Sequence, residues 1–150
     1  MSARRRVPRA PLVRLAWLAV AALSVACGKS PQARAADALD AATSWSAAAK
    51  MVAEQWERGA VPRRYTTEAL RTSGEQLQRT GRSIERMAQV PDTLGAAALR
   101  DIMDASAAAE RARRAVERSD ATGIAPEIDT LGRVAQRLRQ RSQAVTAANR

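Results

Sequence analysis

The stretch of sequence that decides the fold is residues 70–87, LRTSGEQLQRTGRSIERM. Leu70, Leu77 and Ile84 recur in it at intervals of seven residues. A second set of positions follows each of them by three residues: Ser73, Thr80 and Met87. Residues at this spacing lie on one face of an α-helix and form the seam along which helices pack. The stretch therefore predicts an amphipathic helix, over residues 62–89, whose seam carries two polar members.

Two glycines and a proline modify this helix. Gly74 and Gly81 each lower helix stability by up to about 1 kcal/mol relative to alanine, and they permit a neighbouring helix to approach closely. Val90 precedes Pro91, and a residue before proline disfavours helical backbone angles. The helix is therefore expected to end just before this pair.

The same periodicity predicts helices over three further segments: residues 31–58, 92–118 and 125–147. The first is expected to begin at Pro31, after the potential cap Ser30, and to end before Gly59. Residues 119–123, SDATG, are predicted to form a turn, with the fourth helix beginning near Pro126.

Long amphipathic helices with short connections favour antiparallel neighbours. Residues 31–150 are therefore predicted to form an all-α, up-down-up-down four-helix bundle, which follows an N-terminal signal helix. The alternative is a three-helix bundle with a loosely docked first helix. Alanine dominates the predicted apolar faces, so the helices are expected to pack close together.

A different pattern occupies the start of the chain. Residues 1–14 carry five arginines and no acidic residue, and the uncharged run of residues 15–26, LAWLAVAALSVA, follows them. A run of about 12 residues is too short to span a bilayer core of about 30 Å, but it has the length of a signal-peptide core. The small Ala26 then precedes Cys27, the single cysteine, as a signal peptidase requires.

Residues 1–27 resemble the signal peptide and lipobox of bacterial lipoproteins. The resemblance implies that the Cys27 thiol is alkylated with diacylglycerol, that the lipoprotein peptidase cuts between Ala26 and Cys27, and that the new amine is acylated. The family usually has Leu three residues before the cysteine, whereas this chain has Ser24 there and Leu23 one residue earlier. The segment also satisfies the A-x-A rule of the ordinary signal peptidase, which would release a soluble protein beginning at Cys27.

The resemblance also implies a location. Residues 27–30 would form a short tether between the lipid and the bundle. In enteric lipoproteins an Asp after the lipidated cysteine retains the protein at the inner membrane, so Gly28 favours the outer membrane, with the bundle facing the periplasm. The alternative location is the soluble periplasm. The short apolar run disfavours an uncleaved anchor, and Val7-Pro8 after the arginines disfavours a twin-arginine signal.

The charge of the chain argues against a nucleic-acid partner. There are 25 basic and 15 acidic residues, a net charge of +10, but five of the basic residues lie in residues 1–14, which leaves +5 for the remainder. The charges are interspersed, and one tyrosine and three tryptophans are the only aromatic residues. A nucleic-acid binder more typically shows a basic block with stacking aromatics.

The chain also lacks the residues of most catalytic and metal sites. It has no histidine, which removes His-based triads and most zinc sites, and acylation would block Cys27. Carboxylates recur as pairs three residues apart: Asp37/Asp40, Glu54/Glu57 and Asp101/Asp104. Di-iron bundles add histidines to such pairs, so these are expected on solvated helix faces, with Asp101 and Asp104 as the exception to examine. Neither an enzyme activity nor a cofactor is expected. An enzyme that uses carboxylates and arginines is the third alternative, and it would need a deep polar pocket at carboxylates such as Asp101 and Asp104.

The candidate partner surface consists of four residues near the first connection: Trp56, Arg63, Arg64 and Tyr65. Trp56, like Trp45, is expected to pack in the core, with an aromatic patch for a partner as the alternative. The arginines and Tyr65 form either a solvated turn or a site for an anionic partner. The sequence thus predicts a lipid-anchored envelope protein, partnered by the membrane and by another envelope protein, or else a soluble periplasmic binding or sensing protein.

Overall fold

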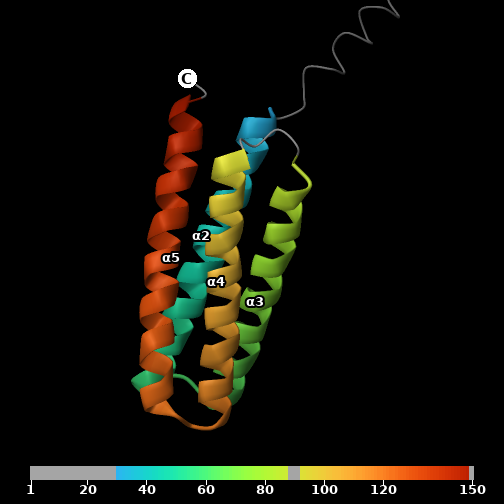
Figure 1. Ribbon diagram of the computed structural model, residues 1–150. Helices are drawn as coiled ribbons and strands as arrows, with labels where there is room; N and C mark the ends of the chain where they lie inside the picture. The colour runs from blue at the N-terminus through green and yellow to red at the C-terminus, as the bar shows by residue number, and fades with distance from the viewer. Residues whose placement is uncertain (1–29, 88–91, 149–150) are drawn as a thin grey trace, which may run out of the picture. The chain divides into compact units, whose positions relative to one another are not determined.

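The computed structural model describes residues 30–87 and 92–148 of the 150 residues. Four helices account for nearly all of them: α2 (Pro31–Glu57), α3 (Arg63–Glu85), α4 (Asp92–Glu117) and α5 (Ala121–Ala148). Each helix runs antiparallel to the one before it (Figure 1). Helix α2 packs on α3 and α5, and α4 packs on the same two helices. The predicted all-α, up-down-up-down four-helix bundle is confirmed.

The bundle forms one compact unit, Pro31–Arg150. Its first helix is an integral part of the core, because Ala42, Ala49 and Ala53 of α2 are fully buried. The alternative of a loosely docked first helix is therefore wrong. Within the described residues, no helix is long and apolar enough to cross a membrane.

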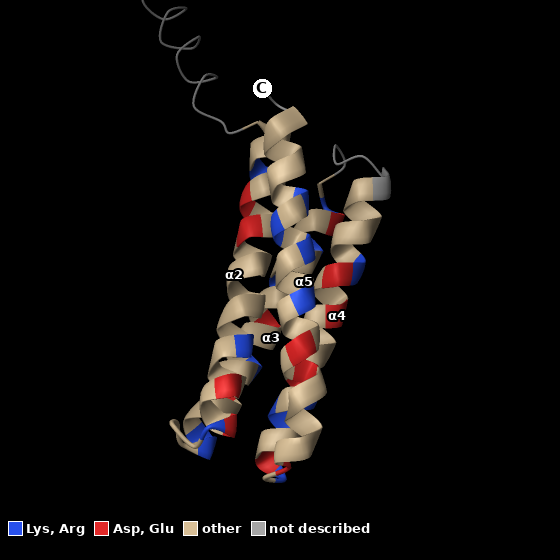
Figure 2. Cartoon of the chain, turned by 90° about the vertical axis from the view of Figure 1, so that its left-hand side faces the viewer, with Lys and Arg blue, Asp and Glu red and all other residues tan. Residues whose placement is uncertain are grey.

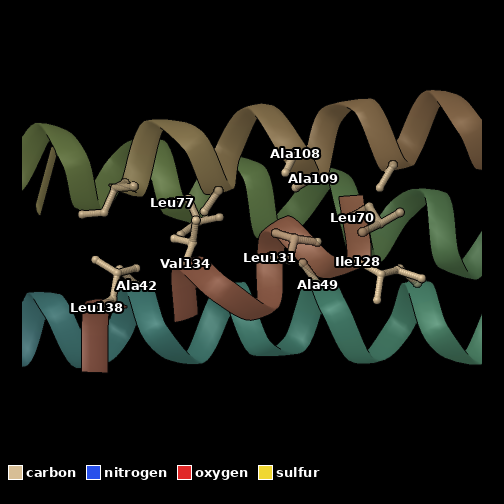
Figure 3. Packing of buried hydrophobic residues seen from close by; sticks show 14 of the residues in the cluster. Ala42, Ala49, Leu70, Leu77, Ala108, Ala109, Ile128, Leu131, Val134 and Leu138 are labelled. Atoms are coloured by element: carbon tan, nitrogen blue, oxygen red, sulfur yellow. The ribbon is translucent and has the colours of Figure 1, made fainter. Parts of the chain in front are cut away.

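Small and large side chains are distributed unequally among the four helices. Most of the buried hydrophobic residues of α2 and α4 are alanines, whereas those of α3 and α5 include Leu70, Leu77, Leu131 and Leu138. Among the described residues, α2 and α4 also touch across the bundle, but α3 and α5 do not. Figure 3 shows Leu77 and Val134 meeting between the labelled alanines. The large side chains of one diagonal pair thus fill the core, and the alanines of the other pair let their helices approach.

Two buried hydroxyls of α2 are satisfied within their own helix. The hydroxyl of Thr43 donates to the Leu39 carbonyl at 2.8 Å, and that of Ser46 donates to the Ala42 carbonyl at 2.8 Å. A buried hydroxyl without such an acceptor would cost roughly 1–3 kcal/mol. The bond to the preceding turn explains how a seam with polar members can be buried without a loss of that size.

Helix α2 ends before Gly59, as predicted, but α3 ends earlier than predicted. Gly59, with φ of 71°, ends α2 through bonds from its N–H to the Trp56 carbonyl and from the Ala60 N–H to the Gln55 carbonyl, the pairing of a Schellman motif. The predicted end of α3 at 89 is wrong, because this helix ends at Glu85. The Met87 N–H bonds to the Ile84 carbonyl, only three residues back, which closes the last turn before the predicted end.

The predicted start of the fourth helix is also wrong. Helix α5 begins at Ala121 and includes Pro126, rather than beginning beside it. The Asp120 carboxylate accepts bonds from the Gly123 N–H and the Thr122 hydroxyl, both at 2.9 Å, and so caps the first turn. These bonds, first the one from the Gly123 N–H and then the one from the Thr122 hydroxyl, lower the pKa of the Asp120 carboxyl. The cap starts the helix within the segment predicted to be a turn.

We expect Ala49→Leu to lower the free energy of unfolding by about 1–3 kcal/mol, because the larger side chain overfills a fully buried site on the small-residue diagonal. Ala47→Leu, two residues away on the exposed side of α2, is the matched control and should change the value by less than about 0.5 kcal/mol. Urea denaturation followed by circular dichroism measures both. Equal losses in the two variants would contradict this account of the core.

In the turn after α4, Ser119 holds a backbone conformation in which glycine would be more stable. Ser119 has φ of 56° and holds the position that Gly59 occupies after α2, with a bond from its N–H to the Val116 carbonyl. A residue with a Cβ is strained in this left-handed region. Ser119→Gly is therefore expected to raise the free energy of unfolding by about 0.5–1 kcal/mol, and Gly59→Ser to lower it by a similar amount. Denaturation midpoints that move the same way in both variants would exclude this explanation.

Candidate functional site

Asp101 is the buried carboxylate of the predicted pairs. Its residue is 5% exposed, and it accepts bonds from the Nε of Arg137 at 2.7 Å and the Nε of Arg141 at 2.8 Å. The Nη2 of Arg137 also lies 4.0 Å from the Oδ2 of Asp104, which is largely exposed. The expectation of a solvated face is therefore wrong for Asp101, although Asp104 does face the solvent. A single carboxylate joins α4 to two successive turns of α5.

The two arginines of the Asp101–Arg137–Arg141 cluster compensate the buried charge of Asp101. A charge removed from water is costly unless it is paired and hydrogen-bonded. Here both carboxylate oxygens accept a charge-assisted bond, and the two guanidinium groups remain partly exposed. Both oxygens are thus engaged by arginines of α5, and the cluster is a clamp between the two helices.

We expect Asp101→Asn to lower the free energy of unfolding by about 2–3 kcal/mol, because two guanidinium groups lose their anionic partner in a largely buried contact. Asp104→Asn, three residues away and exposed, should cost less than about 0.5 kcal/mol. Chemical denaturation at neutral pH measures the difference. If the two losses were equal, the clamp would not be a significant source of stability.

The other carboxylate pairs do not converge on a site. Asp37 and Asp40 are exposed on α2, as is Glu57, while Glu54 forms an ion pair with Lys50 on the same helix. Across residues 30–87 and 92–148, no three histidine, cysteine or acidic residues lie close enough to hold a metal ion.

The structure separates the four residues of the predicted partner surface. Trp56 is partly buried and packs against the core, as does Trp45, which agrees with the core interpretation of both tryptophans. Arg63 and Arg64 are exposed, and Tyr65 is 59% exposed. These three residues form the first turn of α3, rather than the connection before it.

A fourth exposed side chain joins them, which sequence reasoning missed. Arg58 follows the last residue of α2, so it lies at the same end of the bundle as the start of α3. We call Arg58, Arg63, Arg64 and Tyr65 the basic tip. The signal in the sequence was three arginines within seven residues around a Gly and a Pro, which mark a tight connection that places them together.

An apolar groove between α3 and α4 was also missed. It has a volume of about 420 Å³, and Gly81, Leu99, Ile102 and Met103 form much of its lining. Met103 is 62% exposed, and a Cβ at Gly81 would lie 3.4 Å from the Cδ1 of Leu99. A Cβ at Gly74 would lie 3.9 Å from the Cβ of Ala109, so both positions have room for a methyl group in ordinary van der Waals contact.

Glu110 lies on the rim of this groove. Its carboxylate accepts bonds from the guanidinium of Arg113 at 2.7 and 2.9 Å, which lower the pKa of the Glu110 carboxyl. Glu110 is therefore ionised at neutral pH, and its charge is largely compensated by its own helix.

Ala26 and Cys27, the predicted cleavage and lipidation residues, lie outside the described residues. Comparisons with protein-family models, with curated proteins and with solved structures found no match for the chain.

Proposed function

We propose that this chain is a lipid-anchored protein of the bacterial cell envelope, whose four-helix bundle is a non-catalytic interaction module. The observation that carries the proposal is the spacing between two features. The apolar run of residues 15–26 ends at Cys27, and the compact bundle begins only four residues later, at Pro31. Cleavage before Cys27 would therefore remove the signal and leave all four helices α2 to α5 intact.

The length of the tether supports an anchor close to the bundle. Four residues of extended chain span at most about 14 Å, so acyl chains on Cys27 would hold the start of α2 near a membrane surface. Two or three acyl chains give stable anchoring without a membrane-spanning helix. The residue after Cys27 is Gly28 and not the Asp that retains enteric lipoproteins at the inner membrane, which favours the outer membrane.

The arrangement of carboxylates supports a non-catalytic role. Asp101 is engaged on both oxygens by arginines, and Glu54 is paired with Lys50. An interaction module needs instead a rigid scaffold with an exposed surface of suitable chemistry, and the basic tip at the α2–α3 connection is such a surface.

The intact mass of the N-terminal peptide, taken from membrane and soluble fractions of expressing cells, tests the anchor. We expect a peptide that begins at Cys27 and carries the mass of two or three acyl chains, in the membrane fraction. Cys27→Ala should lose both the added mass and the membrane association. Gly28→Asp, the matched control, should keep the acyl chains but shift the protein towards the inner membrane.

Each other result has a definite meaning. An unmodified peptide beginning at Cys27 in the soluble fraction would show that the ordinary signal peptidase makes the cut, and the protein would then be a soluble periplasmic one. A chain that retains residues 1–26 would refute both forms of the proposal.

A further inference from the structure

The basic tip gathers three exposed arginines at one connection of the bundle, with the exposed Glu57 next to Arg58. Arg58, Arg63 and Arg64 are exposed, and within residues 30–87 and 92–148 none of them forms an ion pair. By contrast, Arg71 of α3 is paired with Glu68 and Glu75, and Arg113 of α4 with Glu110 and Glu117. Figure 2 shows blue segments gathered where α2 turns into α3. The tip is thus a place where an anionic partner finds guanidinium groups available.

The arginines are accompanied by aromatic surface. Tyr65 follows Arg64 directly and is 59% exposed, and Trp56, three residues before Gly59, is only partly buried. Arginine, tyrosine and tryptophan are the residues enriched at the energetic centres of protein–protein interfaces. An exposed tyrosine beside Arg64 adds rigid apolar contact area that binding to a simple ion would not require. The composition therefore fits a protein partner with an acidic surface.

The basic tip also lies at the end of α2 that is far from the tether, where a partner protein could reach it. Helix α2 has 27 residues, so its two ends are about 40 Å apart. The tether of residues 27–30 joins one end of α2, and the tip is at the other. If the chain is anchored through Cys27, as proposed above, the tip can stand about 40 Å from the anchor, beyond the headgroups of the anchoring membrane. We infer that the basic tip docks an acidic surface on a second envelope protein. The location of this partner and its distance from the membrane rest on the function proposed above.

Fluorescence anisotropy on the full processed chain, purified from cells, tests the inference. The probe is a short labelled peptide rich in Glu and Asp, compared with the same peptide in which Gln and Asn replace them. We expect the wild-type protein to bind the acidic peptide, more weakly as salt is added, and to bind the amide peptide at least about tenfold more weakly.

The variant that removes the tip is Arg58→Glu combined with Arg63→Glu and Arg64→Glu. It should weaken binding of the acidic peptide at least about tenfold. Acidic residues are favourable in the first turn of a helix, so the two changes in α3 should not unfold it, and circular dichroism checks this. The matched control reverses three exposed arginines elsewhere, Arg34, Arg79 and Arg100, and should weaken binding much less.

The contribution of the aromatic residue is tested separately. Tyr65→Ala should weaken binding, and Tyr65→Phe should restore most of it, because the ring rather than the hydroxyl supplies the contact area.

Three results would overturn the inference. Equal losses in the two triple variants would mean that net charge alone drives binding. Equal binding of the amide peptide would mean that the partner is not acidic. Binding to vesicles of anionic phospholipid that depends on the tip, without binding to the acidic peptide, would identify a lipid surface instead. The anisotropy readout does not depend on whether Cys27 is acylated, so its failure is distinct from failure of the lipid anchor.

Discussion

The packing of the small faces of α2 and α4 against the large side chains of α3 and α5 is the interaction on which the rest of the structure depends. Helix axes separate by about 8–10 Å according to the side chains between them. The fully buried alanines, Ala42 and Ala49 of α2 and Ala108 and Ala109 of α4, leave room at the centre, and larger side chains of α3 and α5 such as Leu77 and Leu131 fill it (Figure 3). A core of this kind buries little apolar area per residue of α2 or α4, so its stability depends on packing without gaps.

Polar interactions between helices also stabilise the bundle, and they join α4 to both of its neighbours. The Asp101–Arg137–Arg141 cluster connects α4 to two turns of α5, and the Ser106 hydroxyl donates to the Gly74 carbonyl of α3 at 3.4 Å. Most of the remaining ion pairs lie within single exposed helix faces, where each contributes less than about 1 kcal/mol. The clamp therefore differs from them in kind, because it is buried and joins residues more than 30 positions apart.

The bundle also has two chemically different ends. One end begins four residues after Cys27, and the other presents the basic tip. A bundle of antiparallel helices can hold an anchor at one end and an interaction surface at the other without a conformational change. The proposed anchor and the proposed docking surface are independent, since the first depends on covalent chemistry at residues 26–27 and the second on charges about 40 Å along α2.

Several features were predictable because they depend on neighbours in the sequence. The spacing of Leu70, Leu77 and Ile84 predicted a helix with one buried face, and Gly59 marked the end of α2. Helix boundaries that depend on a competition between local bonds were less predictable: the Asp120 cap starts α5 before Pro126. The exposed Arg63, Arg64 and Tyr65 were identified from composition, but Arg58 joined them only because the turn at Gly59 folds the chain back.

The sequence by itself determined the helical fold class and the apolar residues, such as Leu70, Leu77 and Ile84, that line the buried faces, because the period of apolar residues is a property of each segment alone. It also determined which chemistries are excluded by the residues that the chain lacks, above all histidine. The tertiary structure decided which faces meet. Asp101 is buried, rather than solvated, because α5 brings Arg137 and Arg141 to it from 36 and 40 residues away. No local pattern specifies that pairing, since it depends on the rotation of two helices about their axes.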